Sequence, residues 1–109
     1  MRLCFWAGTA LLATSGSALA QSLEVKVDNF GTSNGISTAV FRVANNGQTD
    51  AKNVRVQCVF FDKEKKAVDI GLAVLDFIPK GTTAYGKTMV ASQGREDTVG
   101  CGPLSAVFE

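Results

Sequence analysis

The stretch VANNGQTDAKNVRVQCVFFDKEKKAV, residues 43–68, decides the fold. Apolar and polar residues alternate, a polar break follows, alternation resumes through Cys58, and a charged break precedes further apolar residues. Alternation with a period of two is typical of β-strands that bury one face, and such breaks are typical of turns. The stretch therefore predicts consecutive strands of an antiparallel β-sheet protein.

The strongest predicted strand is NVRVQCVFFD, residues 53–62. Its inward face is expected to carry Val54, Val56, Cys58 and Phe60, and its opposite face Arg55, Gln57, Val59 and Phe61. About six polar residues follow the preceding strand, more than the two of a tight hairpin turn. We therefore expect this connection to carry the chain from one sheet to the other, so that two inward faces meet in a sandwich.

The remaining predicted strands lie on both sides of this stretch. They are residues 22–28 (SLEVKVD), 36–45 (ISTAVFRVAN), 67–78 (AVDIGLAVLDFI), 82–91 (TTAYGKTMVA) and 103–109 (PLSAVFE). The predicted loops are residues 29–35 (NFGTSNG), 62–66 (DKEKK), 79–81 (PKG) and 92–98 (SQGREDT). Six or seven short strands with a turn about every ten residues predict a small immunoglobulin-like antiparallel β-sandwich.

Residues 1–20 have the layout of a secretory signal peptide. Arg2 precedes an apolar stretch, and small residues at positions 18 and 20 suit a signal peptidase. Cleavage is expected between Ala20 and Gln21, which leaves residues 21–109 as one domain in the periplasm or outside the cell. The alternative is a retained membrane anchor, which the polar residues that interrupt the apolar stretch disfavour.

Two cysteines, Cys58 and Cys101, remain after the predicted cleavage. An even number of cysteines in a small exported domain predicts a disulfide. Closing a loop of 43 residues stabilises a fold by about 4 kcal/mol in the chain-entropy description. The alternative is an inert buried Cys58 with an unrelated Cys101. A redox-active pair is disfavoured because no Cys-x-x-Cys motif is present.

About half of the predicted domain follows a recognisable pattern. A valine strand ends in Asn-x-Gly, Ala-x-Asn-Val-x-Val follows, and then come an aromatic-Asp strand end, a hairpin and a proline-glycine turn. The residues are Val43, Asn45, Gly47, Ala51, Asn53, Val54, Val56, the segment 58–62 (CVFFD), Ile78, Pro79, Gly81 and Tyr85. This pattern resembles the FxLyD family of small immunoglobulin-like modules in bacterial and archaeal envelope proteins.

The resemblance has three departures. Cys58 stands at the family's signature phenylalanine, Phe61 stands at its tyrosine, and Lys80 is inserted between proline and glycine. The matching residues are structural, so the resemblance implies a fold and an envelope location. It implies no catalytic residues, because the family has none in common, and function is not given by a fold.

Composition excludes several kinds of chemistry. Residues 21–109 contain ten Lys and Arg against ten Asp and Glu, which gives no reason to expect a nucleic acid or a membrane surface as partner. The chain has no histidine, and Met89 is the single methionine after cleavage. A nucleophile therefore lacks its usual base, and zinc or copper lacks ligands. We expect no enzyme activity, no metal and no cofactor.

Carboxylate pairs are the remaining catalytic candidates. The nominal pairs are Asp69 with Asp76 and Glu96 with Asp97. A glycosidase would also need a cleft with aromatic platforms, and a domain this small leaves little chain to build one. We interpret these residues as surface carboxylates that balance lysines.

Two functions from different classes remain. The first is a protein-interaction or envelope-structural module, with an unidentified envelope protein or a second copy as partner. The second is an accessory binder or inhibitor for a peptide or a cell-wall saccharide, for which residues 21–109 offer only Tyr85 besides phenylalanines. Val59 and Phe61 form the candidate interaction patch, since both lie on the outward face of the central strand. The alternative is that lysine stems or neighbouring strands cover them.

Overall fold

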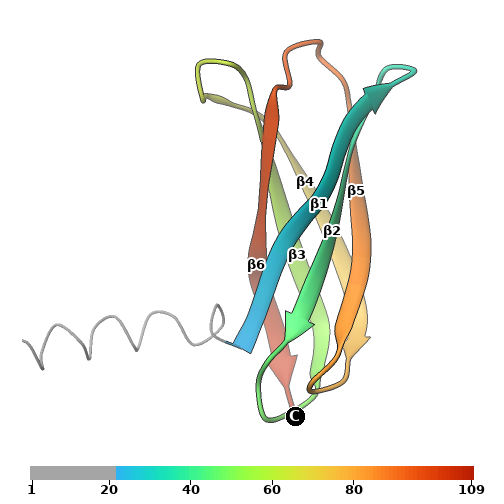
Figure 1. The fold of residues 1–109 in the computed structure, drawn as a ribbon, viewed down its shortest axis with the longest axis vertical. Helices are drawn as coiled ribbons and strands as arrows, with labels where there is room; N and C mark the ends of the chain where they lie inside the picture. Colours follow the sequence, from blue (N-terminus) through green and yellow to red (C-terminus); the bar gives the residue numbers. More distant parts are fainter. Residues whose placement is uncertain (1–21) are drawn as a thin grey trace, which may run out of the picture.

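The computed structural model describes residues 22–109 as a sandwich of two three-stranded antiparallel sheets (Figure 1). The strands are β1 (Leu23–Ser33), β2 (Ile36–Asn45), β3 (Ala51–Phe61), β4 (Ala67–Ile78), β5 (Thr83–Ala91) and β6 (Thr98–Phe108). Sheet A has the order β1-β2-β5 and sheet B the order β4-β3-β6. This order corresponds to strands A-B-E and C′-C-F of an immunoglobulin domain. The predicted fold class is confirmed, whereas the predicted cleavage site between Ala20 and Gln21 lies outside the described residues.

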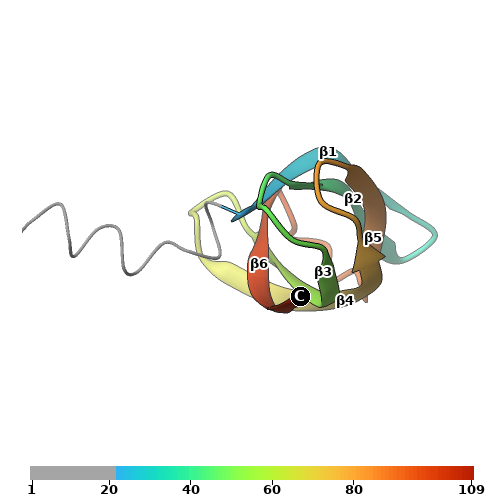
Figure 2. The ribbon, with the colours of Figure 1, turned by 90° about the horizontal axis from the view of Figure 1, so that it is seen from below.

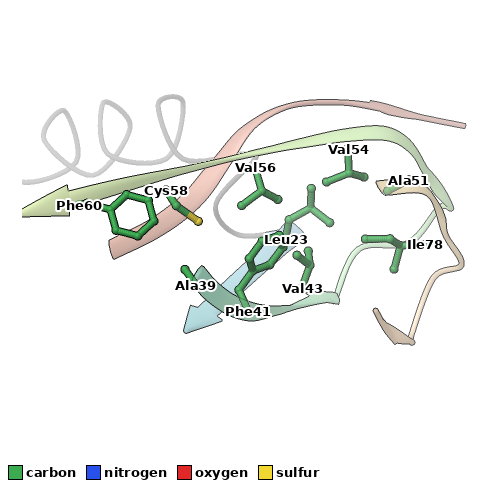
Figure 3. Close-up of a cluster of buried hydrophobic side chains, with 10 residues drawn as sticks. All are labelled: Leu23, Ala39, Phe41, Val43, Ala51, Val54, Val56, Cys58, Phe60 and Ile78. Atoms are coloured by element: carbon green, nitrogen blue, oxygen red, sulfur yellow. The ribbon is translucent and has the colours of Figure 1, made fainter. Parts of the chain in front are cut away.

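The core lies between the inward faces of the two sheets (Figure 3). Its buried members are Leu23, Ala39, Phe41, Val43, Ala51, Val54, Val56, Cys58, Phe60 and Ile78. The predicted parity of β3 is confirmed, because its four predicted inward residues are all completely buried. β3 contributes most to the core because it is the central strand of sheet B, with β4 on one side and β6 on the other.

The edges of the two sheets lie against one another. β1 runs beside β6 and β4 beside β5, without backbone pairing between these strands (Figure 2). The approach of β4 to β5 is close, since a Cβ on Gly71 would lie 2.5 Å from the Thr88 hydroxyl. That hydroxyl donates a hydrogen bond of 3.4 Å to the carbonyl oxygen of Leu72 on β4. Each edge strand is thus flanked by an edge strand of the other sheet.

The first hairpin differs from the prediction. Residues 29–35 are not a loop, because β1 continues to Ser33 and pairs with β2 up to a two-residue turn. The turn residues Asn34 and Gly35 have φ angles of 54° and 77°, as a type I′ turn requires. The last residues of β1 are mostly exposed and polar, so they lack the alternation that would have identified them as strand.

Asn45 fixes two connections between the sheets. Its side-chain amide nitrogen donates to the carbonyl oxygens of Ile78 (2.9 Å) and Thr49 (3.0 Å). Its side-chain oxygen accepts a 3.0 Å hydrogen bond from the Gly47 amide, and its backbone pairs with Gly81 and Thr82. The long connection after Asn45 does carry the chain from sheet A to sheet B, as predicted. The buried Asn45 side chain therefore links this crossing to the end of β4, where the crossing from β4 to β5 begins.

The last strand is longer than predicted. β6 begins at Thr98 instead of Pro103, and Pro103 lies near its middle. Proline cannot donate a ladder hydrogen bond, so it is tolerated where a strand forms a sheet edge, as β6 does. Two register shifts interrupt the pairing of β6 with β3 between Lys52 and Val56.

Candidate interaction surface

The two cysteines join neighbouring strands of sheet B. Cys58 on β3 and Cys101 on β6 are direct partners in the antiparallel register, with their Cα atoms 4.0 Å apart, and they form a disulfide. Cys58 is completely buried. The predicted bond is therefore confirmed, and it ties the central strand to the edge strand that ends the chain.

The predicted patch residues lie on the outward face of sheet B, where both are half-buried. Val59 stands opposite Ile70 on β4 and Gly100 on β6. The Phe61 ring is the nearest group to Gly100, 3.9 Å from the place where a Cβ would be. Neighbouring strands thus shape the surroundings of both residues, which was one of the alternatives that the sequence left open.

The most exposed apolar residues of this face lie on β4. Ile70, Leu72 and Val74 alternate along the strand and are 53%, 63% and 57% exposed. We call these three residues the β4 stripe. In the register with β3 they stand opposite Val59, Gln57 and Arg55. The stripe therefore continues the predicted patch across the sheet, from Val59 onto the edge strand.

The β4 stripe is not predicted from the sequence. The segment AVDIGLAVLDFI is apolar at both parities, so it did not indicate which residues face outward. The shared parity of Ile70, Leu72 and Val74 becomes informative only through the pairing with β3, which shows that this side of β4 faces outward.

The apolar area extends to the far end of sheet B. Phe77 on β4 and Val107 on β6 both stand opposite Lys52 in the register and are 49% and 45% exposed. We call the outward side of β4, β3 and β6 the sheet B face. Charges on it are few. Arg55 is exposed and stands opposite Val74, and Asp76 is exposed two residues after Val74 on β4. Lys52 forms a 3.0 Å ion pair with Glu109.

The outward side of β1, β2 and β5, the sheet A face, has a different character. Glu24 pairs with Lys26 at 3.7 Å, and Asp28 pairs with Arg42 at 3.4 Å. Tyr85 stands opposite Arg42 in the register and is 64% exposed. Four of these residues, together with two neighbours, line a shallow hollow. Its lining is Glu24, Lys26, Arg42, Ala44, Thr83 and Tyr85. Such a surface offers hydrogen bonds and one aromatic ring.

Two of the four carboxylates in the nominal pairs, Glu96 and Asp69, accept hydrogen bonds from residues close in sequence. Glu96 accepts hydrogen bonds from the Gln93 amide (2.7 Å) and the Ser92 hydroxyl (2.9 Å). The backbone hydrogen bond from Gln93 is the main cause that lowers the pKa of Glu96 to about 2. Asp69 accepts from the Ile70 amide at 2.8 Å.

Across residues 22–109, no three or more His, Cys, Asp or Glu side chains gather in a way that could hold a metal ion. The same part of the chain contains no helix long and apolar enough to cross a membrane.

Comparisons with known proteins give structural similarities alone. No family model matches the chain, and no curated protein matches it. A solved target of the Northeast Structural Genomics Consortium is similar with a TM-score of 0.47 and 15% identity, over 83% of this chain and 87% of its own. A candidate ApaA protein from Bordetella pertussis is similar with a TM-score of 0.45 and 15% identity, over 78% of this chain and 89% of its own.

Proposed function

We propose that this protein is a non-enzymatic, exported β-sandwich module that binds a protein of the cell envelope through the sheet B face. The β4 stripe carries the proposal. Three consecutive outward residues of one strand are apolar and each is more than half exposed. Contiguous exposed apolar surface on a small domain marks interaction sites far more often than isolated apolar residues do.

Two further observations support an exported module. The Cys58–Cys101 disulfide requires an oxidising compartment to form and persist. The first 20 residues have the layout of a signal peptide, with expected cleavage between Ala20 and Gln21. The resemblance to the FxLyD modules agrees with this location. We therefore propose the periplasm or the cell exterior as the site of action.

Crosslinking capture from a native envelope extract tests the proposal. Leu72→Asp places a charge in the middle of the β4 stripe, and Met89→Asp is the matched control on sheet A, because Met89 is also more than half exposed. The wild type and Met89→Asp are expected to capture the same proteins, and Leu72→Asp to lose them. Unchanged capture by a folded Leu72→Asp variant would contradict the proposal.

A second candidate function is favoured by the hollow on the sheet A face. An exposed tyrosine beside charged and hydroxyl groups is the kind of site that binds a peptide or a cell-wall saccharide. Titration of labelled protein with muropeptides, followed by NMR, tests this candidate. We expect shifts around Tyr85 that disappear in Tyr85→Ala. Shifts that persist in this variant would place the ligand elsewhere.

A further inference from the structure

We infer that the occupant of the sheet B face is a second copy of this chain, so that two sheets B pack face to face in a symmetric dimer. The inference rests on the proposed function, since it requires this face to be an interface. Two twisted sheets that pack on each other form a layered contact of the same kind as the core of a sandwich. The apolar residues of β4 are the natural centre of such a contact.

The charges of the sheet B face suit a second copy. Lys52 is already paired with Glu109, which leaves Arg55 and Asp76, of opposite sign, near Val74. In a two-fold dimer each surface meets an identical surface. A two-fold axis near Val74 would bring Arg55 of each copy toward Asp76 of the other. Residues 21–109 carry ten positive and ten negative side chains, so two copies have no net charge that opposes their approach.

The area of the sheet B face sets the expected affinity of the dimer. Three strands about 4.8 Å apart, with about ten residues at about 3.3 Å each, give roughly 480 Å² of flat area per copy. Two such faces bury about 1,000 Å² together, near the lower limit of specific interfaces. The dimer is therefore expected to be reversible and dependent on concentration. Each copy keeps its own closed core, so dissociation does not unfold it.

The edges of the sheets are less suited to self-association. β4 and β6 are flanked by β5 and β1, and the carbonyl oxygen of Leu72 already accepts the Thr88 hydroxyl. Pro103 removes one backbone donor from β6. Covered edges and edge prolines are common protections against strand addition. A second copy is therefore expected on the face of sheet B instead of along its edge.

Sedimentation velocity on protein produced from the full chain tests the inference over about 1 μM to about 1 mM, the range for weak complexes. The wild type is expected to pass reversibly from monomer to dimer. Leu72→Asp should weaken the dimer by about ten-fold or more, whereas Met89→Asp should leave it unchanged. Both side chains are largely exposed, and circular dichroism with thermal unfolding checks that each variant is folded.

A charge exchange tests the two-fold arrangement. Arg55→Asp should weaken the dimer by placing two like charges together, and the double variant Arg55→Asp with Asp76→Arg should restore it. Failure of the double variant to recover the dimer overturns the two-fold arrangement. A dimer that survives both Leu72→Asp and Arg55→Asp overturns the choice of this face.

A wild type that stays monomeric over the whole concentration range overturns the second copy as occupant. The capture experiment then separates the two proposals. If capture from the envelope extract still depends on Leu72, the proposed function stands with a different protein as partner. If capture does not depend on Leu72, the proposed function falls as well.

Discussion

The sheet A face and the sheet B face cover the same core from opposite sides, yet they differ in chemistry. Sheet A presents two ion pairs, Tyr85 and the isolated Met89 to water, whereas sheet B presents the three consecutive apolar residues of the β4 stripe with few charges. Both sheets have three antiparallel strands, and the outward side of such a sheet is normally polar. The sheet A face shows that this fold does not need a continuous apolar stripe on its outer side, so we attribute the β4 stripe to an interaction and not to folding.

The two sheets also differ in how their strands are joined. Sheet B has the Cys58–Cys101 bond between β3 and β6, whereas the strands of sheet A contain no cysteine. β6 pairs only with β3, and two register shifts interrupt that pairing. The covalent bond therefore secures the strand that is paired least regularly.

The largest expected effect comes from removing this bond. Replacing both Cys58 and Cys101 with alanine should lower the free energy of unfolding by about 4 kcal/mol. The reason is that the unfolded chain gains conformational entropy when the 43-residue loop is no longer closed. Chemical denaturation measures the loss, and hydrogen exchange locates it. We expect β6 to lose protection before β1, β2 and β5. Reduced wild-type protein, which keeps both sulfur atoms, is the control. An equal loss of hydrogen-exchange protection in the two sheets would contradict the claim that the disulfide stabilises sheet B more than sheet A.

A smaller effect on stability is expected at Asn45, and here both sheets should lose hydrogen-exchange protection equally. Asn45→Ala leaves the buried carbonyl oxygen of Ile78 and the Gly47 amide without their partner, which costs about 1–3 kcal/mol. Asn29→Ala is the control, because the Asn29 side chain is exposed and accepts only from the adjacent Phe30 amide. Since Asn45 holds both crossings, hydrogen exchange should rise in both sheets alike. A loss of hydrogen-exchange protection confined to one sheet would show that the two crossings are held independently of each other.

The smallest expected effect concerns the loop from β5 to β6, which contains Glu96. Its pKa is lowered to about 2 in the folded protein, below its value in an unfolded chain. The contribution of Glu96 to stability is therefore present above about pH 4.5 and is lost as the pH falls toward about 2. Unfolding midpoints of the wild type should fall over this window more than those of Glu96→Gln. Parallel curves for the two proteins would show that Glu96 does not stabilise this link.

Local sequence patterns predicted the sandwich from the alternation of its strands. They predicted the disulfide from the signal-peptide layout and the even number of cysteines. The alternation around Cys58 identified the inward residues of β3 correctly. The turn at Asn34 and Gly35 was missed, since polar residues before it hid the end of β1. The crossing after Asn45 was predicted, because about six polar residues follow that strand instead of the two of a hairpin turn.

The candidate surface was predicted only in part for a physical reason. Val59 and Phe61 were found because β3 shows a clear alternation. The β4 stripe was missed because AVDIGLAVLDFI is apolar on both sides, and only pairing with β3 shows which side faces water. The role of Asn45 depends on a partner 33 residues away in sequence, which no local pattern can indicate.

The position of the disulfide also sets how far this protein can be stretched. An extended chain spans about 3.5 Å per residue, so the sequence separation of 43 from Cys58 to Cys101 represents about 150 Å of length. A pull applied to the two ends passes through the sulfur atoms and cannot extend this segment. Strands β4 and β5 and the loops on both sides of them lie inside this segment, so under tension the β4 stripe belongs to the part of the chain that cannot be extended.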